Sequence, residues 1–166
     1  MNVRQETVDS IFQIVSQSFF INRKLDRIVS VLGVDFALSG ISNKVHLGIS
    51  HLVPIISDQV GEKCLERYNI SVEYGATPDG KEDFESALDI FQSIEDMIVV
   101  YQNMFIGAMK IAFKNDDLQI FADLSDTLRD VNKIVEQVVL LNDKAKAYGE
   151  DRLILLDSEI DKFWVL

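Results

Sequence analysis

The spacing of four long amphipathic stretches most constrains how this chain can fold. Apolar residues recur at intervals near the helical period, which predicts helices at 5–32, 42–68, 82–113 and 117–148. The links 33–41 and 114–116 are short, so the helices on either side of each must form an antiparallel pair. The link 69–81 is longer and carries turn signals at Tyr74-Gly75 and Pro78-Asp79-Gly80. We therefore expect two helical hairpins joined by one long connection.

The long link is able to cross the whole bundle. About 13 extended residues span roughly 40 Å, and a helix of about 27 residues has that length. The helix at 82–113 should then run parallel to the helix at 42–68. The expected fold is an all-α, up-down-down-up four-helix bundle that forms a single domain over 1–166. A short helix is expected at about 158–165, and its apolar end must dock on the bundle or on a partner.

Pro54 interrupts the helix expected at 42–68. A proline inside a helix removes one backbone hydrogen bond and kinks or breaks the helix. The sequence allows two outcomes, which are a kink at Pro54 or a fresh helix start capped by Ser50.

Charge and composition exclude several classes of protein. The net charge of −11 argues against direct binding to nucleic acid or to anionic membranes. No run of about 18 apolar residues is free of charge, so we expect no membrane span. Arg4, Glu6 and Asp9 interrupt the first apolar stretch, which argues against a signal peptide. The single Cys64 excludes an intrachain disulfide framework, and we expect a cytoplasmic protein.

Three short motifs carry a family resemblance. Glu66-Arg67 followed by Tyr74-Gly75-Ala76-Thr77-Pro78-Asp79-Gly80 resembles the end of the second helix and the next loop of Dps-type mini-ferritins. Asn115-Asp116-Asp117 before an apolar helix resembles the turn between the last two helices of ferritin-like bundles, and 149–163 is similar to the tail of bacterial ferritins. With the order of the helices, the chain resembles the ferritin-like superfamily, whose bundles have one long crossover.

The histidines depart from the pattern of that superfamily. Ferritins and related di-iron proteins place Glu-x-x-His on bundle helices. This chain has only His46 and His51, and the residues three positions before them are Asn43 and Gly48. The four-helix di-iron centre of the family therefore does not carry over, and the metal-site pattern is degenerate.

His51, Asp58 and Glu62 form the first candidate metal site. Their spacings of seven and four place them on one stripe of the helix at 42–68, away from its expected core face. Mini-ferritins bind iron between subunits related by a two-fold axis, with an Asp and a Glu four apart on one subunit and a His from the other. The resemblance therefore implies that Asp58, Glu62 and His51 hold a metal.

Other residues compete for these roles. Alignment through the Glu66-Arg67 pair selects Glu62 and Glu66 instead, while His46 could take the histidine role and Asp35 is a further candidate. Imidazole and carboxylate ligands suit iron, with manganese or zinc as substitutes. The other interpretation is an ordinary polar helix face that binds no metal.

Asp26 and Glu95 form a second candidate set inside the bundle. Asp26 falls among the core positions of the helix at 5–32, and Glu95 falls in the apolar seam of the helix at 82–113. A buried carboxylate needs a metal, a base or a hydrogen-bond network. The pair therefore indicates either a reduced metal centre or a polar layer that fixes the helix register.

Two functions follow from these patterns. The first is a ferritin-like metal-handling protein that stores iron or, as a ferroxidase-type oxidoreductase, oxidises Fe(II) with oxygen or peroxide. The second is a metal-free ferritin-like bundle that acts as a structural or protein-interaction module. In both, Leu47, Ile55 and Leu65 form a second apolar strip on the helix at 42–68, which predicts a homo-oligomer assembled through that helix.

Overall fold

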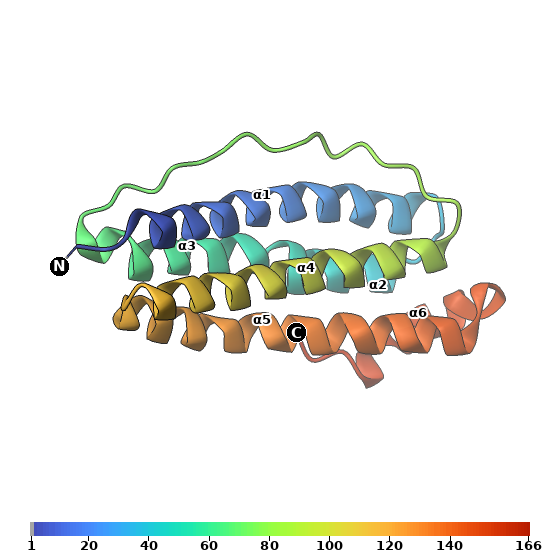
Figure 1. The fold of residues 1–166 in the computed structure, drawn as a ribbon. Coiled ribbons are helices and arrows are strands. Elements are labelled where there is room, and N and C mark those ends of the chain that lie inside the picture. The colour runs from blue at the N-terminus through green and yellow to red at the C-terminus, as the bar shows by residue number, and fades with distance from the viewer. Residues whose placement is uncertain (1) are drawn as a thin grey trace.

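The computed structural model describes residues 2–166, which form an elongated four-helix bundle (Figure 1). Three of the four bundle helices are continuous, and the other is built from several helical segments. The single helices are α1 (Gln5–Val34), α4 (Ala87–Lys114) and α5 (Leu118–Tyr148). This composite helix consists of α2 (Ser39–Val45), a π-helical turn (His46–Ser50), α3 (Leu52–Cys64) and a 3₁₀ turn (Glu66–Tyr68). The chain continues through a 3₁₀ turn (Glu150–Arg152), α6 (Leu153–Ser158) and another 3₁₀ turn (Ile160–Lys162).

The expected up-down-down-up topology is confirmed. Figure 1 shows α2, α3 and α4 running in one direction and α1 and α5 running in the other. The crossover 69–86 returns along the outside of α1 from the end of α3 to the start of α4. Two hydrogen bonds attach it to α1: the Gly75 N–H donates to Ser16 Oγ at 3.1 Å, and Arg23 Nη1 donates to the Pro78 carbonyl at 3.3 Å.

The third long helix begins later than the sequence predicts. We expected it to begin at residue 82, but α4 begins at Ala87. Glu82 forms an ion pair with Lys24 of α1, which keeps this part of the chain in the crossover. The first turn of α4 is then capped twice, since Ser86 Oγ accepts from the Asp89 N–H at 3.2 Å and the Glu150 carboxylate accepts from the Ala87 N–H at 2.9 Å.

The position expected for the last helix, 158–165, is wrong. The helix α6 ends at Ser158, and 163–166 is a non-helical tail. The Asp157 carboxylate accepts from the Ile41 N–H at 2.6 Å and from the Gly40 N–H at 3.1 Å, so it caps the start of α2 and places α6 beside it. The buried Trp164 then docks on this chain's own bundle, which was one of the two outcomes the sequence left open.

The interior of the bundle is largely aliphatic. Large side chains of α4, including Phe91, Tyr101 and Phe105, are fully buried among isoleucine, leucine and valine from the other helices. Each such side chain contributes about 1.5–3 kcal/mol when buried. In residues 2–166, no helix combines the length and the apolar content that crossing a membrane requires.

Candidate functional site

The outer face of α3 and the 3₁₀ turn after it carry the carboxylates that the sequence selects. Asp58, Glu62 and Glu66 are all exposed and follow one another at intervals of four residues. They line a hollow of about 180 Å³, together with Val72 and Tyr74 of the crossover. The structure therefore brings the three carboxylates together on one surface, where a cation or a second subunit has access to them.

The two histidines lie close together on the preceding π-helical turn. The ring centres of His46 and His51 are 4.4 Å apart, with the ring planes at 65°. His51 is exposed and His46 is half-buried. Seven residues separate His51 from Asp58, which is about 10 Å along a helix. Within one chain, the histidines and the carboxylates are therefore two neighbouring groups and not one cluster.

The π-helical turn has a cause in the sequence. Pro54 has no N–H to donate to the Ser50 carbonyl, four residues earlier. That carbonyl instead accepts from Asn22 Nδ2 of α1 at 2.8 Å, and Ser50 Oγ donates to Asp26 Oδ1 at 2.6 Å. The helix at this position is therefore not capped afresh by Ser50, whose hydroxyl donates to Asp26 instead. It widens before the proline, and polar side chains of α1 satisfy the groups that are freed.

Asp26 and Leu65 do not lie where the sequence predicts. Asp26 is exposed at the edge of α1, although its carboxylate accepts from the buried Ser50 hydroxyl, so it is not a core carboxylate. Leu65 is fully buried, whereas Leu47 and Ile55 are exposed as expected. The helix ends at Cys64, which turns Leu65 inward and removes it from the predicted strip.

Glu95 belongs to a polar layer between α4 and α5. It is half-buried and accepts a hydrogen bond from Asn142 Nδ2 at 2.6 Å. Gln92 Oε1 accepts from the same Asn142 amide at 3.1 Å and from Lys146 Nζ at 2.9 Å. Asp26 takes part in a different network, between α1 and the π-helical turn. The structure therefore does not bring Asp26 and Glu95 together in one centre.

The sequence interpretation missed one buried carboxylate. Asp123 of α5 is 8% exposed, and its Oδ2 lies 2.8 Å from Arg67 Nη1. The helical period of the sequence could have revealed it, because residue 123 lies on the same face of the helix as the buried Ile120, Leu124 and Thr127. Burial raises the pKa of the neighbouring Cys64 thiol to about 12, and the negative charge of Asp123 adds to this shift. The thiol is therefore neutral and unreactive in the folded chain.

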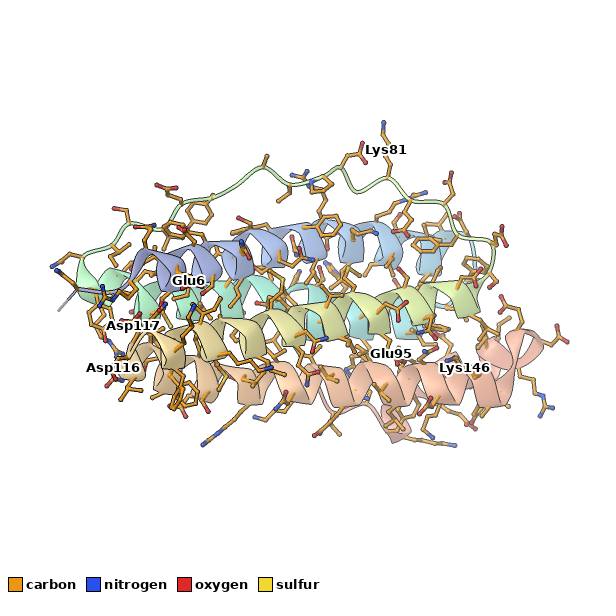
Figure 2. All side chains as sticks on the ribbon, in the orientation of Figure 1. Glu6, Lys81, Glu95, Asp116, Asp117 and Lys146 are labelled. Carbon is orange, nitrogen blue, oxygen red and sulfur yellow. The ribbon has the colours of Figure 1, made fainter. Side chains whose placement is uncertain are left out.

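A larger hollow lies at the end of the bundle, where the chain before α1 meets the α4–α5 turn. Its volume is about 790 Å³, and its lining includes Arg4, Tyr68 and Asp117. The Asp117 carboxylate is already engaged, since it accepts from Thr7 Oγ1 at 2.5 Å and from the Arg4 backbone N–H at 3.3 Å. Figure 2 shows Asp116 and Asp117 at this end, remote from Glu95.

Exposed Asp35 follows α1 and does not join these groups. Within residues 2–166, no three side chains of His, Cys, Asp or Glu gather closely enough to hold a metal ion. The prediction that His51 of one chain meets Asp58 and Glu62 of another concerns two chains, and it stays a prediction.

Comparison with known proteins identifies the fold. The chain matches no protein-family model and no curated protein sequence. It is similar in structure to an open pore ferritin from the hyperthermophilic archaeon Archaeoglobus fulgidus, with a TM-score of 0.87 and 14% identity over 95% of this chain and 97% of that chain. It is also similar to a PmFTN variant soaked in iron, with a TM-score of 0.82 and 17% identity over 93% of this chain and 99% of that chain. The fold is ferritin-like.

Proposed function

We propose that this ferritin-like chain is a subunit that assembles with copies of itself and serves as a structural or interaction module, without a metal centre inside its own bundle. One observation carries the proposal. Asp123 is the only Asp or Glu buried among residues 2–166, and Arg67 pairs with it. A di-iron centre in a ferritin-like bundle uses several carboxylates and histidines that project inward from the helices.

The remaining interhelical carboxylates support the same proposal. Glu95 is bound by Asn142 and Asp26 is bound by Ser50, so each already has a hydrogen-bond donor from a neighbouring helix. Polar contacts of this kind fix how helices are aligned, which is the role we assign to them. Among residues 2–166, the one buried carboxylate and these two interhelical carboxylates all have partners already.

Metal analysis tests the proposal directly. The full chain is purified without chelator, its iron, manganese and zinc are measured, and Fe(II) oxidation in air is followed against buffer. We expect trace metal and oxidation at the buffer rate. Iron retained in stoichiometric amounts after dialysis, and lost in an Asp123→Ala or Glu95→Ala variant, would place a centre inside the bundle and overturn the proposal.

Iron binding between subunits is the second candidate function. It is supported by the exposure of His51 and by the shared hollow of Asp58, Glu62 and Glu66, which a two-fold contact could close around an ion. In this case the assembled protein binds iron, and Asp58→Ala and Glu62→Ala reduce the bound iron while Glu95→Ala does not. Equal iron content in the parent and in Asp58→Ala would remove this candidate.

A further inference from the structure

The π-helical turn brings the chain's two histidines onto one face. In a regular α-helix, residues five apart point about 140° away from each other around the axis. Here the His51 N–H donates to the His46 carbonyl at 3.1 Å, which closes a wider turn. The two ring centres consequently lie 4.4 Å apart. The pairing of His46 and His51 therefore depends on this turn and would be lost in an ordinary helix.

Contacts from two sides hold the turn in place. On one side, Asn22 donates to the Ser50 carbonyl. On the other side, the tail packs so closely that a Cβ at Gly48 would lie 3.2 Å from atoms of both Trp164 and Leu166. The imidazoles are therefore carried by a segment whose backbone is fixed before any ligand arrives, and such preorganisation favours binding.

The donor set selects the class of ligand. No third His, Cys, Asp or Glu joins the pair among residues 2–166, so the pair offers two imidazole nitrogens and leaves room for water. Imidazole suits copper, nickel and zinc, whereas magnesium and calcium prefer oxygen ligands. A metal–nitrogen bond of about 2.0–2.1 Å places each ring centre roughly 3.2 Å from the ion.

The separation of the rings narrows the choice of ion. For an ion bound in line with one nitrogen of each ring, ring centres 4.4 Å apart and each roughly 3.2 Å from the ion subtend an angle of about 90° at that ion. This is the angle between neighbouring ligands in the tetragonal and octahedral geometries of Cu(II) and Ni(II), and it is smaller than the tetrahedral angle that zinc prefers.

We propose that His46 and His51 chelate one Cu(II) or Ni(II) ion on the outside of the bundle, with water in the remaining positions. His51 is exposed, so the ion reaches the pair from solvent. The site uses neither Asp58 nor Glu62 and needs no second chain. It shares His51 with the second candidate function, and the carboxylate variants below distinguish the two sites.

The chain contains its own reporter for this site. Trp164 is the only tryptophan, and its ring lies against Gly48 within the same turn. Cu(II) quenches indole fluorescence at short range, so the full chain is titrated with copper chloride and the emission of Trp164 is recorded. We expect saturable quenching at one ion per chain. Magnesium chloride is the control and should leave the emission unchanged.

Single substitutions separate chelation from binding by isolated histidines. His46→Gln and His51→Gln should each weaken copper binding by about tenfold or more, because the second imidazole acts at high effective concentration. Circular dichroism checks that both variants remain helical, and the exposed position of His51 makes its variant the safer of the two. Asp58→Asn tests whether the carboxylates near α3 take part, and Asp126→Asn, at an exposed position on α5, is the matched control and should bind copper as the parent does.

Three results would overturn the proposed chelation by His46 and His51. The first is unchanged affinity in either single-histidine variant. The second is a stoichiometry of half an ion per chain together with dimer formation, which would indicate a bridge between chains. The third is a loss in Asp58→Asn as large as that in His51→Gln, which would move the ion to the carboxylates of α3.

Discussion

Individual polar residues tie the helices of this bundle together. Asn142 is fully buried in α5, and its amide donates to both Glu95 and Gln92 of α4. On the other side of the molecule, Asn22 and Asp26 of α1 hold Ser50. A buried amide or hydroxyl is costly without a partner, so each of these contacts favours one alignment of the helices over its neighbours.

Replacing Glu95 with Gln tests the layer between α4 and α5. The amide still accepts from Asn142, but the hydrogen bond is no longer assisted by charge, so we expect a loss of about 1 kcal/mol in the free energy of unfolding. Urea denaturation measures this loss. Glu136→Gln, an exposed position on α5, is the control and should change little. Equal effects of the two substitutions would contradict the role of Glu95.

The Cys64 thiol predicts how stability responds to alkaline pH. Burial, followed by the charge of Asp123, raises its pKa from 9.0 to about 12. Its contribution is therefore fully present below pH 9 and is lost as the pH rises from 9 towards 12. The Cys64→Ala variant should lack this part of the alkaline loss, which we expect to reach about 1–3 kcal/mol by pH 11. Urea denaturation of both proteins from pH 8 to 11 measures the difference, and parallel curves would contradict it.

The position of residues relative to the core was predictable only where the helix was regular. Periodicity placed Leu47 and Ile55 away from the core face, and the structure agrees. Leu65 was misplaced because it lies past the end of α3, where the helical period no longer applies. Asp26 was misplaced although α1 is regular: it follows the buried Leu25 and was counted among the core positions, but it lies at the exposed edge of the helix.

The composite helix is the element on which the site depends. Pro54 was recognised in the sequence as an interruption, but the widened turn before it was not, because its stability comes from Asn22 and from the tail. These partners are distant in sequence. The same reason explains the late start of α4, where the caps are Ser86 and the distant Glu150.

Gly48→Ala tests the contact between the composite helix and the tail. The added Cβ would meet Trp164 and Leu166 at 3.2 Å, so the tail must shift. We expect red-shifted Trp164 emission and a loss of about 1–3 kcal/mol. Gly107→Ala in α4 is the matched control, since nothing lies within 4 Å of its Cβ, and it should stabilise the chain by roughly 0.5–1 kcal/mol. Unshifted emission in Gly48→Ala would show that the tail does not pack on this turn.

At the scale of the whole molecule, the composite helix leaves two large apolar side chains uncovered. Leu47 and Ile55 are 57% and 51% exposed on either side of His51. Exposed leucine and isoleucine around one such strip indicate a contact surface. The topology of the bundle was predicted from the lengths of the links alone. Assembly depends on contacts with a second chain, and the apolar pattern of a single chain does not determine them.

Ile55→Glu tests assembly through this face. A charge in a subunit interface costs several kcal/mol, so we expect the parent to sediment as an oligomer and the variant to shift towards the monomer. Val100→Glu is the control because Val100 is similarly exposed, at 50%, on α4. Sedimentation velocity on all three proteins measures the outcome. A monomeric parent at micromolar concentration would remove the predicted interface.

The crossover has a consequence for the integrity of the molecule. Residues 69–86 form a tether of up to roughly 60 Å, and the length of α4 that it must pass is about 42 Å. The slack is only a few residues, so the hairpin α4–α5 finds the hairpin of its own chain at a high local concentration. A tether six residues shorter could no longer reach, and each hairpin would have to pair with one from another molecule, which is an exchange dimer. The length of the crossover therefore decides whether α4 and α5 pack against α1–α3 of their own chain or of another chain.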